Sequence, residues 1–487
     1  MALEKHHVTS SEDKIPVGQK IGYGLGGMAT QVAVNSISNL FLPIYNIGLG
    51  VSPALLGVGQ GIPRAMDAII DPLIGNLSDN TRSRFGRRIP YVFVGGILLG
   101  VTFALLWMVP KGLGEYRTFG YFLIMSMLFY ITSSIFEIPR GALGLEMSND
   151  YHERTRLFAY YSFIVNVGAL TTPWLYWLAN RKSLFTDEVL GMRTIGLAMG
   201  GLFVISSVIC AVVCKEQKLK QAKTQEKVKL WDGIITTSRN RTFVRLLIIT
   251  CMVTIGFNFV VGFSSYILIY YVFSGDKQAA SVWMGWCGTL WALLSLGGVF
   301  VMTWIATHLG KSKTLMIFLI VMAVGNLLKI VCYSKTYPWL VLIPTAAVAM
   351  GMLVLFTLVF AMIADICDED ELRTGKRREG SYQAMYWWWF KIGVGLAFVV
   401  AGFLLKSTGI NEKLVVQSDS TLFWLRFWEI TLPSAVCFMG AMLLVRYPLT
   451  EQKAYEIKAV LAQRKLAFTA EQSIVQEPVT VLGLDAI

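Results

Sequence analysis

Long runs of apolar residues, too long for the core of a soluble domain, dominate this chain. About twelve such runs alternate with short polar loops, and each approaches the roughly 20 residues that a helix needs to cross a hydrocarbon layer. Of the 487 residues, 55% are hydrophobic and only 15% are charged. A soluble protein needs more polar surface than this composition supplies. The sequence therefore predicts an all-α, multi-pass integral membrane protein.

One polar segment divides the apolar runs into two groups of six. Residues 215–242 are rich in lysine and cannot cross lipid, so we interpret them as a cytoplasmic linker. Two groups of helices around such a linker are typical of a transporter built from internal repeats. We predict twelve transmembrane helices in two six-helix bundles. The predicted divisions are a cytoplasmic N-terminal tail (1–20), an N-terminal bundle (21–214), the linker (215–242), a C-terminal bundle (243–446) and a cytoplasmic C-terminal tail (447–487).

The positions of lysine and arginine predict the orientation in the membrane. With both termini in the cytoplasm, about 29 basic residues lie in inside loops and tails and about 9 lie outside, as the positive-inside rule requires. The net charge of +12 is therefore explained by membrane topology. The sequence has no basic patch interleaved with aromatic residues, so it does not predict a nucleic-acid partner. We expect the inner (plasma) membrane, with lipid as the surrounding partner.

Ionisable residues within the apolar runs are the strongest functional signal, because charges inside a membrane are costly. The second run carries Arg64, Asp67 and Asp71, whose spacings of three and four residues place them on one helix face. Two carboxylates one turn apart repel each other, and a bound cation or proton relieves this repulsion. We interpret the pair as a cation-binding site. The alternative is an internal ion pair that only orders the bundle.

Two more runs contain charged residues. Glu137 and Arg140 share a face of the fourth run, with the Ser134 hydroxyl one turn earlier, and Lys391 lies deep in the eleventh run after a series of aromatic residues. Lys391 needs a carboxylate partner from the second or fourth run, unless it extends to the membrane interface. Gln31 shares a polar face of the first run with two asparagines, which suits either a cavity wall or hydrogen bonds between helices.

The motifs of other protein classes do not occur in this sequence. There is no phosphate-binding loop of an ATP-driven pump, no serine-hydrolase or zinc-protease motif, and no Cys/His metal cluster. We therefore predict a secondary transporter rather than an enzyme, with no cofactor, and a membrane enzyme or scaffold is the interpretation least favoured.

Two segments resemble a known family, the glycoside–pentoside–hexuronide:cation symporters of the major facilitator superfamily, of which melibiose permease is a member. The first is DAIIDPLIGNLSDNTRSRFGRRIPY, residues 67–91, and the second is MIADICDEDELRTGKRREGSY, residues 362–382. The resemblance extends over about residues 20–450. It implies the major facilitator fold, a central cavity between the two bundles, and sugar transport by symport.

The resemblance also implies roles for individual residues. Asp67 and Asp71 match the carboxylates that hold the coupling cation, with Ser134 as a further oxygen ligand. Glu137 matches the acidic residue that binds sugar hydroxyls. The remaining residues expected at the substrate are Gln31, Arg64, Arg140 and Lys391.

Some positions differ from the family pattern. Ile70 replaces an asparagine beside the second aspartate, which removes one sodium ligand and slightly favours protons over sodium as the coupling ion. Gln31, Gly141 and Ser162 stand where the family has an aspartate, a tryptophan and an arginine that serve the galactoside site. The substrate of that site is therefore not transferred, and Arg140 suits an anionic solute such as a sugar acid.

We expect a monomer that carries a sugar, glycoside or sugar acid by alternating access, coupled to a proton or to a sodium ion at Asp67 and Asp71. Two alternatives stay open: a lysolipid or amphiphile transporter of the same fold, and an uncoupled facilitator or exchanger. Charged residues of the cytoplasmic loops are expected to form a gate that holds the outward state, namely Asp79, Arg87, Arg88, Asp365, Asp368 and Arg377.

Overall fold

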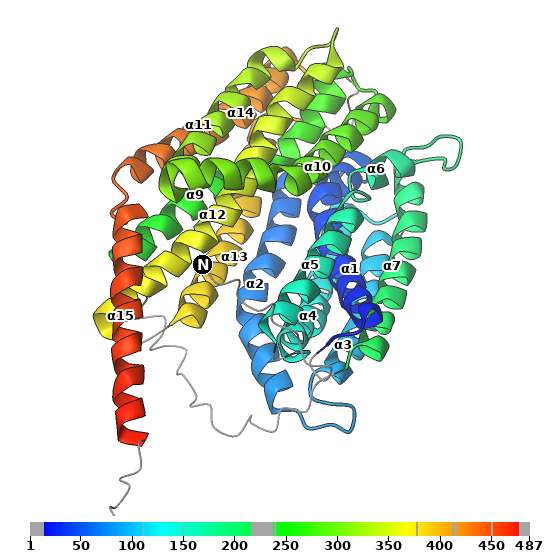
Figure 1. Cartoon of the computed structure of the whole chain (residues 1–487). Coiled ribbons are helices and arrows are strands. Elements are labelled where there is room, and N and C mark those ends of the chain that lie inside the picture. The colour runs from blue at the N-terminus through cyan, green and yellow to red at the C-terminus, as the bar shows by residue number, and fades with distance from the viewer. Residues whose placement is uncertain are drawn as a thin grey trace, which may run out of the picture.

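The secondary structure of the described residues is entirely helical in the computed structural model (Figure 1). The structure describes residues 14–110, 112–148, 150–215, 237, 240–375, 378–411, 414, 416–449 and 451–476. Most of the predicted linker, 215–242, therefore lies outside the described residues.

Six helical rods of the described chain precede the linker, two of them continued by a short second segment. They are α1 (Val17–Phe41) with the π-helical η1 (Leu42–Gly48), α2 (Pro53–Asn80), α3 (Ile89–Trp107), α4 (Glu115–Glu146), α5 (Tyr151–Ala169) with α6 (Trp174–Ala179), and α7 (Glu188–Val213). The fifth apolar run is interrupted at 170–173, where Pro173 lacks the N–H that would continue the hydrogen-bond ladder.

The described residues after the linker form a similar set, followed by a C-terminal helix. They are α9 (Arg241–Tyr266) with the π-helical η2 (Ile267–Val272), α10 (Lys277–Leu309), α11 (Lys311–Cys332), η3 (Pro338–Val341) with α12 (Leu342–Thr374), α13 (Glu379–Ser407), α14 (Asp419–Val445) and α15 (Glu451–Gln476). The first helix of each set ends in a π-helical segment, so the two halves are structurally similar at this point.

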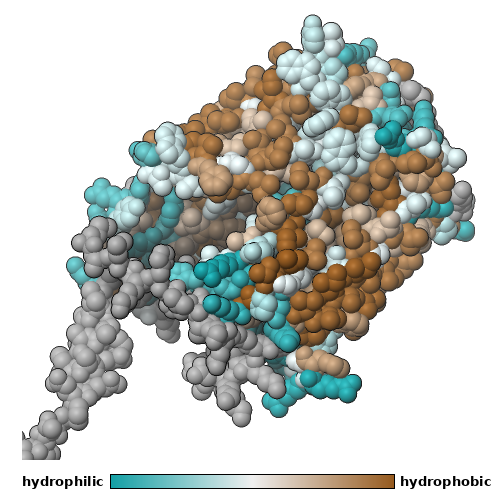
Figure 2. Space-filling view, turned by 45° about the vertical axis from the view of Figure 1, so that its right-hand side comes forward, coloured by the Kyte–Doolittle hydropathy of each residue, from teal (hydrophilic) through white to brown (hydrophobic). Residues whose placement is uncertain are grey.

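Nine helices in the described part of the chain are long and apolar enough to cross a membrane, judged by length and composition. The helices α1, α2 and α5 are not among them, although each packs within the first bundle. Of these, α2 carries four charged side chains, which lower its hydropathy. The count of twelve spans therefore stays a prediction. Figure 2 shows hydrophobic residues over the flanks of the molecule and hydrophilic residues gathered towards its ends.

Two hydrophobic cores hold the bundles together. One is formed mainly by residues of α1–α7, together with the C-terminal end of α9 and with η2. The other is formed by residues of α9–α15. The C-terminal helix α15 contributes Ile457 and Leu461 to the second core, and the Lys458 ammonium lies 2.9 Å from an Asp365 carboxylate oxygen. Part of the predicted C-terminal tail is therefore packed against the bundle.

The bundles converge at one end and separate at the other (Figure 1). At the convergent end α2 packs against α13 through glycines: a Cβ on Gly57 would lie 2.9 Å from the Gly402 Cα, and one on Gly61 would lie 2.5 Å from the Gly395 carbonyl oxygen. Such contacts bring two backbones together at small residues, as in many membrane helix pairs. The separated end carries the basic loop after α2. The charge bias predicts that this end faces the cytoplasm, and on that prediction the conformation is inward-open.

A larger side chain at Gly57 is expected to prevent closure of the outer end. In Gly57→Leu the new side chain would collide with the Phe398 carbonyl and the Gly402 backbone, which cannot move aside as a flexible side chain could. Since overpacking costs about 1–3 kcal/mol, the population with an open outer end should rise by at least about fivefold relative to the closed one. The measurement is labelling of a Leu42→Cys reporter by an impermeant maleimide applied from outside.

The matched control is Gly201→Leu, because nothing lies within 4 Å of a Cβ built at Gly201. Labelling of the reporter should stay at the starting level in this control. Equal labelling rates for the two leucine variants would contradict the inference that close packing of the α2 and α13 glycines closes the outer end.

Candidate functional site

A cluster of charged side chains from α2, α4 and α13 lies where the two bundles meet. Lys391 of α13 donates a hydrogen bond of 2.9 Å to an Asp67 oxygen and a second hydrogen bond to Asp71. The Ser134 hydroxyl of α4 donates to the other Asp67 oxygen at 2.6 Å. The Arg64 guanidinium lies 3.6 Å from Asp67, one turn away on α2. Three residues that the sequence assigned to the cation and two that it assigned to the solute are therefore in one cluster.

The cluster is balanced in charge and largely shielded from solvent. Two carboxylates face two cationic side chains, and Asp67 is 5% exposed. Asp71 and Lys391 are more accessible, with side chains 19% and 21% exposed. The Lys391 ammonium bridges the two carboxylates and so lies where the sequence analysis predicted the coupling cation. Because Lys391 belongs to the C-terminal bundle, this bridge also joins the two bundles.

Two polar side chains that the sequence analysis missed support Arg64. The Arg64 guanidinium lies 5.1 Å from the centre of the Tyr130 ring, and Gln60 donates a hydrogen bond of 2.9 Å to the Tyr130 hydroxyl. A cation over an aromatic face is stabilised by the ring quadrupole, most strongly where water is excluded. Gln60 lies four residues before Arg64 on α2, the same spacing that joins Asp67 to Asp71, so the helix-face argument could have found it.

The second predicted pair, on α4, has a different character. Arg140 is 2% exposed and donates hydrogen bonds of 2.9 and 2.5 Å to the two oxygens of Glu137. Its guanidinium lies over two rings, 4.7 Å from the centre of Tyr23 and 5.0 Å from the centre of Tyr161. The Glu137 side chain is 34% exposed, so the carboxylate of this pair is the more accessible member. Gln31 of α1 also has an exposed side chain.

The expected gate residues form contacts inside their own bundles in this conformation. Asp79 pairs with Arg88, and both Arg87 and Arg88 contact Glu146 of α4, at 2.8 and 3.2 Å. Asp365 lies 2.5 Å from Lys311 and also contacts Lys458 of α15. Asp368 interacts electrostatically with Lys458 of α15, and Arg377 lies outside the described residues. Their role as a gate stays a prediction.

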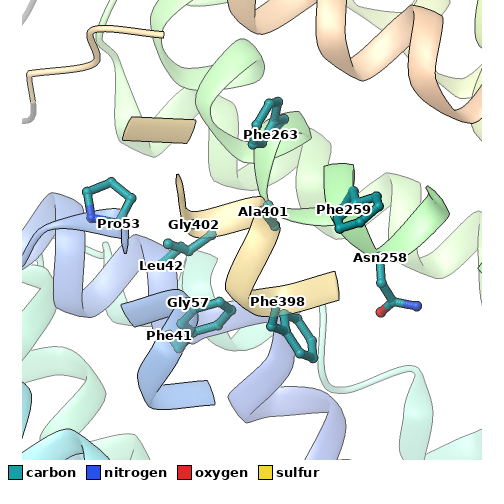
Figure 3. A pocket seen from close by; sticks show the side chains of 11 residues that line it. Phe41, Leu42, Pro53, Gly57, Asn258, Phe259, Phe263, Phe398, Ala401 and Gly402 are labelled. Carbon is teal, nitrogen blue, oxygen red and sulfur yellow. The ribbon is translucent and has the colours of Figure 1, made fainter. Parts of the chain in front are cut away.

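Contacts between the bundles are found at the outer end. The Tyr266 hydroxyl donates a hydrogen bond of 2.5 Å to the Asn46 side chain, and Trp174 donates one of 2.9 Å to Thr289. Figure 3 shows a pocket at this closure, where aromatic rings such as Phe259 and Phe398 surround a largely apolar space. Side chains from α1, α2, α9 and α13 line it, so both bundles contribute to its walls.

The C-terminal bundle contains a further ionic cluster that the sequence analysis missed. Glu429 of α14 is 0% exposed, and one of its oxygens accepts hydrogen bonds from Ser264, Lys329 and Tyr333. Both Lys329 and Glu429 lie inside apolar runs. The rule that selected Asp67 and Lys391 would therefore have found them.

Helical rods in two bundles, with buried charges where the bundles meet, define a membrane transporter of the major facilitator type. The sequence profile described as "MFS/sugar transport protein" matches residues 22–451, and the chain belongs to this family. The prediction of an all-α, multi-pass membrane transporter that is not an enzyme is thereby confirmed.

Curated relatives match along nearly the whole chain. The chain is 27% identical to the "Uncharacterized symporter YnaJ" of Bacillus subtilis, over 90% of this chain and 93% of the relative. It is 23% identical to the "Sodium-dependent lysophosphatidylcholine symporter 1-A" of Danio rerio, over 90% and 87%. It is also 23% identical to the "Putative sulfoquinovose importer" of Escherichia coli, over 93% and 95%.

Solved structures show the same fold at low identity. A bacterial homologue of the lysosomal transporter Spinster, inward-facing and occupied, matches with a TM-score of 0.66 at 15% identity, over 90% of this chain and 97% of that chain. A D-xylose–proton symporter matches with a TM-score of 0.62 at 13% identity, over 90% and 99%.

Proposed function

We propose that this protein is a cation-coupled symporter of a sugar, glycoside or sugar acid that works by alternating access. The observation that carries the proposal is the bridge from Lys391 to Asp67 and Asp71, a paired-carboxylate site filled by a cationic side chain from the opposite bundle. The family and the sugar importer among the relatives support a sugar-like solute.

The bridge gives a physical mechanism for coupling. A proton or sodium ion that binds Asp67 and Asp71 competes with the Lys391 ammonium, because the two carboxylates cannot fully satisfy both cations. Lys391, once displaced, needs a new partner in a site that excludes water. A hydroxyl or anionic group of the solute supplies that partner, so cation and solute bind together better than either binds alone.

The solute would then lie between the bundles. The accessible Glu137 carboxylate accepts hydrogen bonds from sugar hydroxyls, and Arg140 holds that carboxylate in place through two hydrogen bonds. Arg64 and Lys391 supply positive charge for the acidic group of a uronate or sulfonated sugar. Coupling to protons is favoured over sodium because Ile70 offers no oxygen ligand beside Asp71.

Solute-induced thermal stabilisation of the purified protein tests this proposal. Neutral sugars, uronates, sulfonated sugars and lysophosphatidylcholine are screened with and without sodium and at two pH values. A ligand present at 100 times its Kd stabilises the folded state by about 2.7 kcal/mol, which shifts the melting temperature measurably. We expect a sugar or sugar acid to stabilise the protein, and more strongly when the coupling cation is present.

The outcomes separate the alternatives that the sequence left open. If only lysophosphatidylcholine stabilises the protein, the substrate is an amphiphile and the sugar proposal is wrong. Stabilisation by a sugar that is independent of both sodium and pH would contradict cation coupling and indicate a facilitator or exchanger.

A further inference from the structure

A groove of about 370 Å³ lies on the surface of the C-terminal bundle and contains none of the residues of the proposed transport site. Its lining comes from the first two turns of α9 and from one residue near the end of α14, namely Arg241, Val244, Arg245, Ile248 and Leu443. The α9 residues recur at spacings of three and four, so they form one stripe along the helix. The α9 residues between them are buried in the bundle, and the stripe therefore faces lipid.

The groove has a basic part and an apolar part. Arg241 and Arg245 lie at the start of α9, which faces the cytoplasm on the predicted orientation. Val244, Ile248 and Leu443 supply the apolar wall. Ile248 lies about 10 Å farther along the helix axis than Arg241, because seven residues of helix separate them. A phospholipid has the same order of groups, with a phosphate at the interface and acyl chains deeper in the membrane.

The two arginines of the groove have no acidic partner. Among the residues that the structure describes, no carboxylate lies within ion-pair distance of Arg241 or Arg245. Other arginines of the same end are paired: Arg87, Arg156 and Arg373 lie 2.8, 3.2 and 3.9 Å from carboxylate oxygens. The charges in the groove are therefore available to an anion from outside the bundle.

The Arg245 side chain is held in a position that suits a phosphate. Its Nη1 donates a hydrogen bond to the Arg446 carbonyl, which fixes the guanidinium against the end of α14. Its Nε and Nη2 have no hydrogen-bond partner among the described residues. A guanidinium binds phosphate oxygens through two parallel hydrogen bonds, and Arg241, one turn away, can reach the same phosphate.

We propose that this groove binds an anionic phospholipid of the cytoplasmic leaflet, with its phosphate at Arg241 and Arg245 and an acyl chain along Ile248 and Leu443. Basic pockets between transmembrane helices on the cytoplasmic side are suited to such head groups. A zwitterionic lipid fits less well, because its own cation lies beside the phosphate and is repelled by the two arginines. The proposal does not depend on the transported solute or on the coupling ion.

Binding of lipid to the purified full-length protein tests the proposal. Native mass spectrometry measures the affinity for phosphatidylglycerol, with phosphatidylcholine as the zwitterionic comparison. Each basic side chain near a membrane surface strengthens binding of an anionic lipid by roughly fivefold. The double variant Arg241→Gln, Arg245→Gln should therefore bind phosphatidylglycerol about twentyfold more weakly. Its affinity for phosphatidylcholine should stay nearly unchanged.

The matched control is the double variant Arg82→Gln, Arg84→Gln. It removes two exposed positive charges from the loop after α2, at the same end of the molecule but outside the groove. This variant should bind phosphatidylglycerol like the wild type. Equal affinity of the wild type and the groove variant for phosphatidylglycerol, or an equal loss in the loop variant, would overturn the proposal.

A third variant separates the groove from surface charge. Leu443→Trp keeps both arginines but fills the space between α9 and α14, so affinity for phosphatidylglycerol should fall about fivefold or more. Leu443 is 37% exposed, so the larger ring does not enter the core. Wild-type affinity in this variant would mean that the arginines act only as surface charge. Displacement of the lipid by inorganic phosphate, but not by chloride at equal ionic strength, would mean that the site takes a soluble anion. Either result contradicts a lipid site.

Discussion

Replacement of Lys391 by alanine is expected to destabilise the protein by about 3–5 kcal/mol at neutral pH, the cost of leaving buried charges without their partner. The bridge holds Asp67 and Asp71 together, and without it the two carboxylates repel each other beside the single cation Arg64. The loss should shrink as the pH falls, because protonation of one carboxylate removes the repulsion. Thermal unfolding of the purified protein at several pH values measures this.

A lysine in a solvent-exposed ion pair serves as the control. Lys453 pairs with Glu369 at 3.4 Å, with a side chain that is 48% exposed, so Lys453→Ala should cost about 1 kcal/mol or less. The double variant Lys391→Ala, Asp71→Asn should recover most of the lost stability, since one cation then faces one carboxylate. Equal destabilisation by the two single lysine variants would show that the bridge is not an essential contact.

The components of this site were predictable because helix geometry is local. Spacings of three and four residues placed Arg64, Asp67 and Asp71 on one face of α2, and the structure holds them there. The cost of a lone charge in lipid indicated that Lys391 needs a carboxylate, and the structure places it against α2. No property of the sequence alone indicated that Lys391 would bridge both carboxylates, because that depends on how the two bundles meet.

The sequence analysis missed some residues because they meet only in the folded chain. It missed others because the cost of a buried charge was not considered for every apolar run. Tyr130 contacts Arg64 from α4, and an aromatic residue in an apolar run carries no signal of its own, whereas Gln60 lies on α2 itself, four residues before Arg64. Lys329 and Glu429 are separated by 100 residues, yet each is an ionisable group inside an apolar run. The same cost argument applied to every run would have identified both, although not their pairing.

The conformation could not be predicted from the sequence either. The glycines of α2 and α13 allow close approach at the outer end, but the sequence does not say which end is closed. In this conformation Asp79 and Arg88 pair with each other inside one bundle. A gate that spans both bundles would form only when the cytoplasmic ends come together, so these contacts are compatible with the predicted gate without testing it.

Replacement of Asp71 by asparagine is expected to abolish accumulation of solute against its gradient while preserving exchange. The substitution keeps the shape of the side chain but leaves two cations, Arg64 and Lys391, facing the single carboxylate of Asp67. The coupling proton or sodium ion then binds poorly. The coupling free energy of about 1–3 kcal/mol between this ion and the solute is therefore lost. Lys391 remains paired with Asp67, so the site stays ordered.

The measurement for Asp71→Asn is uptake into proteoliposomes of the solute identified by thermal stabilisation. With an imposed proton or sodium gradient, wild-type protein should concentrate the solute, whereas the variant should reach only equal concentrations on the two sides. Exchange of labelled for unlabelled solute needs no gradient and should continue in the variant, which shows that it is folded and can alternate. Asp419→Asn, which removes an exposed carboxylate, should accumulate solute like the wild type. Full accumulation by Asp71→Asn would mean that the coupling ion does not need the Asp71 carboxylate.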